Sequence, residues 1–545
     1  MPCPMLQFSC CCYDVAMKCR IWLLSVLALL VASCSPTSTT ERPVDTIIIG
    51  IESDIQSWNP FLAEDASNEE ILALIYPSLA VEQTDYQNHP PSFEPSLAES
   101  WQYSDDGLEL TLTLRDDAVW SDGVPVTPED VLFSWRAQTS EALGWMWSDI
   151  TDNIQEVEKI DDRTVRFTFT HRYPYQLMDV NDGPIVPAHA WAEIPFEAWE
   201  ETDWSDHVLS AGPYRVASHT RQQEIVLEKN PTYWVPDRPR IARIVFRVVP
   251  SKNSLFTQFL AGELDLVNGV PPTEATKVQT DPDLELRIFQ DRSYTHVCWN
   301  VDNPLFADED IRRALGLAID RQTLIDVVYE GFARPSIGPV LSTMWAFNQE
   351  LEPLAFDPSE ATRLLNDAGW EDSDGDGILD RDGQEFSFEI LAPSVSEVRQ
   401  DVALMIERDL GRIGIEVVPR FIEWGAVQAA VSTADFDAFV NRWIEPTQVD
   451  LEGIWRSTPP DIPTFNFGRY ANAEVDHLLD EVAMAADFET QKPLLDRIQE
   501  IIVADQPYTF LVENVRLVGV NSRISGADIN DAAIFFNIED WYIDQ

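Results

Sequence analysis

Cysteine is scarce in the part of this sequence that is expected to fold. Five of the seven cysteines precede Cys34, and only Cys298 follows it. The folded body therefore has no cysteine pair with which to form an intrachain disulfide. Its cores must be held together by burial of apolar side chains.

Basic residues and long apolar runs are also few. The 545 residues include 37 Lys and Arg against 93 Asp and Glu, which gives a net charge of −56. Such a charge repels phosphate polymers, so nucleic-acid binding is a poor interpretation. Beyond residue 34 no apolar run is long enough to cross a bilayer. What is present is 45% hydrophobic and 10% aromatic residues, ample for two or three folded domains.

The N-terminus has the pattern of an export signal. Residues 21–33 are uncharged and largely apolar, follow Lys18 and Arg20, and are too short to span a membrane as a helix. They end in VASC at 31–34, which resembles the lipobox of bacterial lipoproteins and implies that Cys34 is lipidated. The alternative is an ordinary cleavage site that has a cysteine beside it. Residues 1–33 are thus predicted to be a signal peptide, with the true start expected at Met17.

Residues 34–44 are predicted to be a lipidated tether. Residues 35–44 read SPTSTTERPV, which is small, polar and without periodicity. Such a composition is typical of a flexible linker. We therefore expect a protein held to a membrane through lipid on Cys34.

The body alternates strand and helix patterns. Residues 47–51 form a continuous apolar run, whereas 108–114 and 165–169 alternate strictly, as half-exposed strands of an antiparallel sheet do. Thr127, Pro128 and two acids predict a helix that begins at Pro128. Further helices are predicted after Asn472 and, from the apolar spacing of residues 494–502, after Pro493.

Four stretches together resemble the family 5 solute-binding proteins, the peptide- and nickel-type receptors of ABC importers. They occur in the order of the family over nearly the whole body. They are LTLRDDAVWSDGVPVTPEDVLFSW at 112–135; GPY at 212–214 with EKNPTYW at 228–234; DIRRAL at 310–315 with AIDR at 318–321; and NAEVD at 472–476 with IQEI at 498–501 and Pro507.

The resemblance implies an α/β fold. It is the two-lobed, type II periplasmic-binding-protein-like fold of the large cluster that carries an extra inserted domain. The implied division is 45–85, 200–285 and 506–545 in lobe I, 86–199 in the inserted domain, and 286–505 in lobe II. Such a protein needs no nucleophile, only a cleft with polar groups that satisfy the ligand and a hinge that closes over it.

The resemblance also implies an acidic residue that pairs with the ligand's amino group. The matching stretch is FDAFVNRWIEPTQVD at 436–450, which departs from the usual spacing and leaves Glu445 and Asp450 as candidates. We prefer Asp450, which lies beyond Pro446 just before a predicted helical segment. The alternative is that Asp450 only caps that segment, residues 451–455. Trp443 either lines the cleft or belongs to the core.

Five further ligand-binding candidates follow two predicted strands. Loops at the carboxyl ends of strands face ligands in α/β sheets. Packing or solvated-loop roles are the alternative for each candidate. They are Glu52, Ser53 and Trp58 after the first buried strand, and Trp299 and Asn300 after residues 294–298, a predicted strand crossing between lobes.

An Asp/Gly loop at 372–383 offers a candidate calcium site. Asp372, Asp374, Asp376 and Asp380 occupy positions 1, 3, 5 and 9 of an EF-hand-like loop with glycine at position 6. The twelfth position is Gly383, so the bidentate glutamate is missing. The loop is either a structural Ca²⁺ site or a plain turn, and no other cofactor is expected.

Enzyme signatures are missing from the sequence. Neither a Gly-x-Ser-x-Gly elbow nor a Gly-x-x-x-x-Gly-Lys-Ser/Thr loop occurs, and the seven histidines show no metal-ligand spacing. We therefore predict a monomeric, non-catalytic lipoprotein of the cell envelope. It captures a peptide or similar small solute and delivers it to ABC permease subunits. The alternatives are a solute-sensing or structural lipoprotein on the same fold, or a secreted hydrolase.

Overall fold

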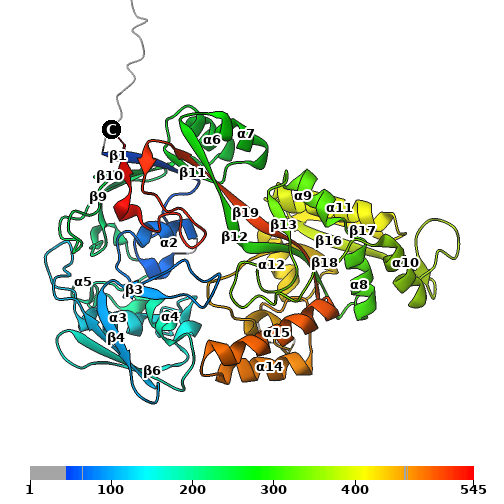
Figure 1. Ribbon diagram of the computed structural model, residues 1–545, viewed down its shortest axis with the longest axis horizontal. Coiled ribbons are helices and arrows are strands. Elements are labelled where there is room, and N and C mark those ends of the chain that lie inside the picture. Colours follow the sequence, from blue (N-terminus) through cyan, green and yellow to red (C-terminus); the bar gives the residue numbers. More distant parts are fainter. Residues whose placement is uncertain (1–44, 64–65, 460–461, 463, 545) are drawn as a thin grey trace, which may run out of the picture. The chain divides into compact units, whose positions relative to one another are not determined.

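The computed structural model describes residues 45–63, 66–459, 462 and 464–544 (Figure 1). The predicted signal peptide, the lipidation site Cys34 and the tether lie outside the described residues. The contacts between residues separate the chain into two units after Thr46. The compact unit that begins at Ile47 is the one described below. Within the described residues, no helix combines the length and apolar character needed to cross a membrane.

An 11-stranded mixed sheet organises this unit. Ile47 and Ile49 of the first strand are buried, as their apolar run predicted. The strand order is β17 (Glu416–Ile422), β16 (Ser387–Pro393), β18 (Ala438–Ile444), β12 (Leu284–Trp299), β19 (Tyr508–Asn521), β11 (Leu266–Asn268), β1 (Thr46–Ile51), β10 (Arg243–Val248), β9 (Glu224–Lys229) and β8 (Tyr214–Thr220), with β13 (Ala333–Pro335) beside β19.

Two long antiparallel strands, β12 and β19, run through the middle of this sheet (Figure 1). The first half of β12, up to Gln290, pairs with the end of β19 that also pairs with β11. The second half, from Tyr294, pairs with the beginning of β19 and, on its other edge, with β18. The register shifts between Gln290 and Tyr294. The predicted strand at 294–298 is thus part of a longer one that joins two groups of strands.

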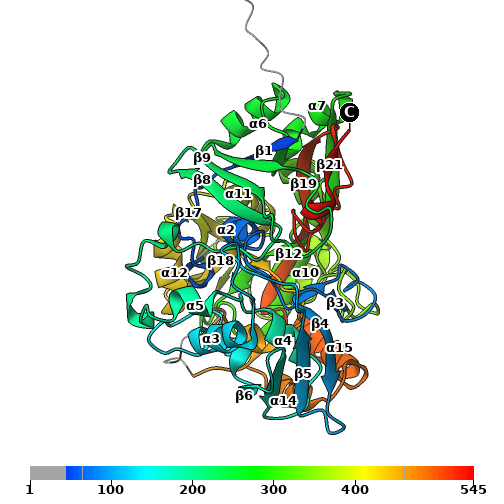
Figure 2. The same ribbon diagram turned by 90° about the vertical axis from the view of Figure 1, so that its left-hand side faces the viewer.

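A separate four-stranded sheet follows the order β4 (Ala98–Tyr103), β5 (Glu109–Leu114), β7 (Thr164–Phe169) and β6 (Ile154–Lys159) (Figure 2). β5 and β7 pair antiparallel, and buried residues alternate with partly exposed ones along both. The alternating patterns therefore predicted these strands correctly. Helix α3 (Pro128–Gln138) begins at Pro128 as predicted, with a capping box between Thr127 and Asp130.

The prediction for the helix near Pro493 was wrong at its start. Helix α15 (Phe488–Asp505) begins five positions earlier and contains Pro493 within its second turn. The Asp487 side chain accepts a hydrogen bond from the Thr490 backbone N–H at 2.9 Å and caps the helix there. Helix α14 (Ala473–Met484) begins after Asn472, as predicted.

The remaining elements are short or cover the sheets. The other helices are α2 (Ala66–Leu72), α4 (Gln176–Asn181), α5 (Ala188–Trp191), α6 (Lys252–Leu260), α7 (Ala275–Thr280), α8 (Glu309–Leu317), α9 (Arg321–Val328), α10 (Pro358–Asp367), α11 (Glu397–Gly411), α12 (Trp424–Ser432) and α13 (Glu452–Trp455). The 3₁₀ turns are η1 (Pro60–Leu62), η2 (Ser148–Thr151), η3 (Phe196–Ala198), η4 (Trp204–Asp206), η5 (Pro272–Glu274) and η6 (Ile538–Asp540). Three two-stranded ribbons complete the set: β2 (Ala80–Glu82) with β3 (Phe93–Pro95), β14 (Asp380–Arg381) with β15 (Gln384–Glu385), and β20 (Ile524–Ser525) with β21 (Tyr542–Ile543).

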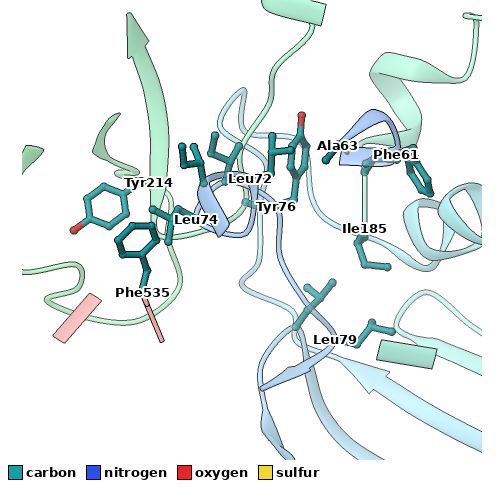
Figure 3. Packing of buried hydrophobic residues seen from close by; sticks show 14 of the residues in the cluster. Phe61, Ala63, Leu72, Leu74, Tyr76, Leu79, Ile185, Tyr214 and Phe535 are labelled. Carbon is teal, nitrogen blue, oxygen red and sulfur yellow. The ribbon is translucent and has the colours of Figure 1, made fainter. Parts of the chain in front are cut away.

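The hydrophobic interior is continuous across segments far apart in the sequence. Figure 3 shows one cluster in which Leu72 and Leu74 lie with Tyr214 of β8 and Phe535 near the C-terminus. All four side chains are less than a tenth exposed. Burial on this scale supports the fold without a disulfide, and the one cysteine among the described residues, Cys298, is buried and free.

Candidate functional site

The predicted ligand-binding stretch begins at the end of β18. Trp443 pairs across the ladder with Tyr294 of β12 and is half-buried. Its ring stacks on Phe467, with centroids 5.7 Å apart and planes 15° apart, and lies 6.4 Å from the ring of His296. Trp443 therefore contributes to an aromatic layer on this part of the sheet.

Glu445 follows β18 directly and is anchored by its backbone. Its N–H donates to the Arg292 carbonyl at 2.7 Å, and Arg292 Nη1 donates to the Glu445 carbonyl at 2.8 Å. Among the described residues the Glu445 carboxylate has neither a hydrogen bond nor an ion pair. Burial, together with the charge of Asp450, raises the pKa of Glu445 to about 8, against the opposing effect of Arg292.

Asp450 takes the local role that was considered as its alternative. Its Oδ1 accepts a hydrogen bond from the Glu452 N–H at 2.7 Å, at the start of α13. Its Oδ2 has no hydrogen-bond partner in the described part of the chain. Burial raises the pKa of this carboxyl, and the charges of Glu452 and Asp149 add to the effect, although the side chain still reaches solvent. Asp450 is thus exposed and is not enclosed in a core.

Three further carboxylates with raised pKa values interact electrostatically with one another or with Asp450, and no sequence pattern marks them as site residues. Asp182, just after α4, is exposed by its residue surface, yet shielding of its carboxyl from water and the charges of Glu82 and Asp179 raise its pKa to about 8. Burial raises the pKa of Asp179 to about 7, and Asp450 contributes. Burial also raises the pKa of Glu82 at the end of β2. We call Glu82, Asp179, Asp182, Glu445 and Asp450 the carboxylate cluster. Among 93 acids, no local pattern distinguishes its members.

The raised pKa of Glu445 predicts a pH-dependent stability. Between about pH 4.5 and pH 8 the unfolded chain ionises this group while the folded chain keeps its proton, so stability falls as pH rises. Glu445→Gln removes the titration. We expect the melting temperature of this variant, relative to the unsubstituted protein, to increase steadily from pH 5 to pH 8.

Glu385→Gln is the control for this measurement, because Glu385 is an exposed residue of β15. Its melting temperature should follow that of the unsubstituted protein at each pH. A constant difference between Glu445→Gln and the unsubstituted protein over the whole range would contradict the prediction.

The candidates after β1 do not form one site. Glu52 is exposed and lies 3.8 Å from Lys252 Nζ, and Ser53 is exposed in the same loop. Trp58 is buried in the hydrophobic cluster of Figure 3, with its ring edge-on to His219 at 5.5 Å. The structure thus gives Trp58 a packing contact and leaves the other two in a solvated loop.

Trp299 and Asn300 have partners inside the protein. Trp299 is fully buried, and its Nε1 donates to Thr509 Oγ1 at 2.9 Å. Asn300 Nδ2 donates to the carbonyls of Ala434, at 3.1 Å, and Phe436, at 2.8 Å. These bonds connect the end of β12 to the segment before β18 and to β19.

The Asp/Gly loop brings together three of its four predicted ligands. Carboxylate oxygens of Asp372, Asp374 and Asp376, all exposed, lie within 4.8 Å of one another. Asp380 instead accepts hydrogen bonds from the backbone N–H and hydroxyl of Ser373. Asp372 and Asp376 also accept backbone N–H bonds within the loop, as in a plain turn.

A cavity of about 490 Å³ lies elsewhere in the unit, and none of the predicted site residues lines it. Its walls include the ion-paired Arg215 and Glu228, with Arg243, Ser121 and Ser210. We place the candidate site at the carboxylate cluster instead, because the cluster contains Glu445 and Asp450 of the stretch that resembles the family.

Residues 92–460 match the profile described as "Bacterial extracellular solute-binding proteins, family 5 Middle". The chain belongs to this family. Family 5 membership means that the protein binds a solute and acts outside the cytoplasm. It also confirms the predicted family, and the first three of the four sequence stretches lie within the matched residues.

Family 5 relatives match over most of their length. The chain is 27% identical to the oligopeptide-binding protein AppA of Bacillus subtilis over 96% of this chain and 97% of AppA. It is 30% identical to Protein XP55 of Streptomyces lividans over 88% and 86% of the two chains.

Solved structures confirm the predicted two-lobed α/β fold. The structure of B. subtilis AppA in complex with a nonapeptide has a TM-score of 0.77, with 92% of this chain and 99% of AppA covered at 27% identity. NikZ from Campylobacter jejuni in complex with Ni(L-His) has a TM-score of 0.78 at 22% identity, with 92% and 100% covered.

Proposed function

We propose that this protein captures a peptide outside the cytoplasm and delivers it unaltered to the permease subunits of an ABC importer. The similarity to AppA, named for oligopeptide binding, supports a peptide over the nickel complex bound by NikZ. A receptor of this kind performs no catalysis and needs no resident cofactor. It would act as a monomer, because its ligand is enclosed by two lobes of one chain.

The observation that carries the proposal is the unpaired Glu445 carboxylate beside Asp450. Glu445 is partly buried, and a carboxylate that is partly shielded from water and has no cation beside it is unfavourable when charged. Its raised pKa is consistent with this environment. A peptide's terminal ammonium would supply the missing charge to Glu445 or Asp450. A charge-assisted hydrogen bond of this type contributes about 1.5–3 kcal/mol.

Calorimetric titration with trialanine and with N-acetyl-trialanine tests this role. Acetylation removes the ammonium and leaves the rest of the peptide unchanged, so we expect it to weaken binding by about tenfold or more. Mass spectrometry of the recovered peptide should find it intact. Equal affinities would contradict the role of the carboxylates, and a cleaved product would favour the hydrolase alternative.

The lobe boundaries and the membrane anchor are parts of the same proposal. We place residues 45–85, 200–285 and 506–545 in lobe I, 86–199 in the inserted domain and 286–505 in lobe II. The register shift between Gln290 and Tyr294 supports a hinge in β12. Removal of residues 1–33 and lipidation of Cys34 would hold the receptor at the membrane, which metabolic labelling with a fatty acid and a Cys34→Ser control would test.

A further inference from the structure

The cavity of about 490 Å³ adjoins the end of the large sheet that β8, β9 and β10 form. Three of its lining residues, Arg215, Glu228 and Arg243, form one row across these strands. Arg215 pairs with Glu228 between β8 and β9, and Glu228 pairs with Arg243 between β9 and β10. Residues directly opposite one another in a sheet point to the same face, so all three side chains project from the face that lines the cavity.

The glutamate in this row balances only one of the two arginines. Arg215 donates from Nε, at 3.0 Å, and from Nη2, at 2.7 Å, to the same oxygen, Glu228 Oε1. Arg243 is exposed, and its side chain forms neither an ion pair nor a hydrogen bond with any described residue. Acids outnumber bases in this chain by 93 to 37, so an arginine without a carboxylate partner is unexpected. The wall of the cavity therefore has one uncompensated positive charge.

Two serines far apart in the sequence also line the cavity. Ser210 is 1% exposed, and its backbone N–H donates to Ser121 Oγ at 3.1 Å. Ser121 Oγ is the acceptor in this bond, and its own hydrogen has no acceptor among the described residues. Arg215 Nη1 is likewise unused in the described part of the chain, because Nε and Nη2 make the bonds to Glu228. The lining thus holds three available donors: the Ser121 hydroxyl, Arg215 Nη1 and the Arg243 guanidinium.

Hydrogen-bond donors around a cavity with a net positive charge are suited to an oxyanion. A guanidinium forms paired, charge-assisted hydrogen bonds with carboxylate and phosphate groups. The net charge of −56 does not exclude an anion, because in about 0.15 M salt charges more than about 8 Å away are largely screened. The groups of the lining then decide what binds. A volume of about 490 Å³ lies within the range of small-molecule sites.

We propose that this cavity is a second binding site, which holds a carboxylate or phosphate group between Arg243, Arg215 Nη1 and the Ser121 hydroxyl. Glu228 holds the Arg215 guanidinium in place through Oε1, and Arg243 offsets the negative charge that Glu228 brings. The site goes beyond peptide capture and does not depend on it. The same oxyanion occurs in free solutes and in phospholipid headgroups, and the choice of probes separates the two sources.

Calorimetric titration with inorganic phosphate, succinate and monomeric dihexanoyl phosphatidylglycerol tests the inference at constant ionic strength. Arg243→Met keeps an unbranched side chain and removes the guanidinium. We expect this variant to bind the best probe about tenfold or more weakly than the unsubstituted protein. Tighter binding of phosphatidylglycerol than of phosphate would assign the site to a lipid headgroup, and the reverse would assign it to a free anion. Absence of binding by all three probes would overturn the inference.

Arg313→Met is the matched control, because it removes the same charge from a different place. Arg313 is an exposed residue of α8, forms no ion pair within the described residues and does not line the cavity. This variant should keep the affinity of the unsubstituted protein for the best probe. An equal loss in Arg243→Met and Arg313→Met would assign the binding to the general field and overturn the site.

Melting temperatures separate a lost site from a lost fold. Any salt screens the repulsion within so acidic a chain, so the best probe is compared with sodium chloride at equal ionic strength. The probe should stabilise the unsubstituted protein and Arg313→Met more than chloride does, and Arg243→Met no more than chloride does. A probe that never exceeds chloride would overturn the inference.

Titration of Arg243→Met with trialanine distinguishes this inference from the proposed function. Because the cavity lining contains no member of the carboxylate cluster, trialanine should bind the variant as it binds the unsubstituted protein. Loss of trialanine binding together with the anion would contradict a separate site. Anion binding that fails while trialanine still binds would overturn the second site and leave peptide capture supported.

Discussion

Asp291→Asn is expected to lower the free energy of unfolding by about 3 kcal/mol, the cost of breaking a buried ion pair. The Asp291 side chain is nearly inaccessible and accepts hydrogen bonds from Arg442 Nη2, from Arg516 Nη2 at 2.6 Å and from Ser293 Oγ at 2.6 Å. Burial acts to raise the pKa of this carboxyl, yet Arg516 and Arg442 outweigh it and the pKa is lowered. The variant leaves two arginines facing each other without their shared anion.

The position of Asp291 connects this loss of stability with the hinge. It lies in the register shift of β12, where Arg442 comes from β18 and Arg516 from β19. The ion pairs thus link strands β12, β18 and β19 at the register shift in the middle of the large sheet. We expect the variant to unfold at lower urea concentration.

Urea denaturation followed by tryptophan fluorescence measures this effect. The control is Asp117→Asn, whose carboxylate pairs with Arg115 at 2.5 Å but is 55% exposed, so its loss should stay below about 1 kcal/mol. Arg442→Met keeps the Asp291–Arg516 pair and should give an intermediate loss. If Asp291→Asn were no more destabilising than Asp117→Asn, the ion pairs of Asp291 with Arg442 and Arg516 would contribute little to stability.

Trp199→Ala is expected to cost about 4 kcal/mol of unfolding free energy, because it removes a large, fully buried side chain and leaves a cavity. The ring packs between segments that are otherwise separate, and its Nε1 donates to the Ile194 carbonyl at 3.1 Å. Its aromatic neighbours lie 5.0–6.1 Å away and are Phe61, Phe133, Phe196, Trp191 and Trp204.

Trp147→Ala is the matched control, since that tryptophan is 48% exposed and should cost less than about 0.5 kcal/mol. Trp199→Phe should retain part of the packing and give an intermediate value. Thermal and urea unfolding of the three variants together test the ranking. A Trp199→Ala protein as stable as Trp147→Ala would mean that the neighbours close the cavity without strain.

Local features of the fold could be predicted because their causes are local. The alternation in β5 follows from which face meets the core, and the start of α3 follows from Thr127 and Asp130, which bond to each other three residues apart. Pro493 misled the prediction because a proline favours the first turn of a helix. In α15, the Asp487 cap fixes an earlier start.

The candidate site could be predicted only in part. Glu445 and Asp450 were identified because they lie in a stretch that resembles the family, yet the sequence could not tell which carboxylate would lack a partner. Asp450 accepts a local backbone hydrogen bond, whereas the Glu445 carboxylate has none among the described residues. Glu82 and Asp182 were missed because acids are too numerous for any pair to stand out.

The sequence by itself determined the family, the mixed α/β character, the strong negative charge and the reliance of the described body on burial rather than disulfides. Tertiary structure alone decided which carboxylates act on one another's pKa, that Arg292 is held on backbone carbonyls, and that Asp291 joins three strands. The physical reason is that pKa and ion pairing depend on distance and on exclusion of water. Both arise when segments far apart in the chain pack together.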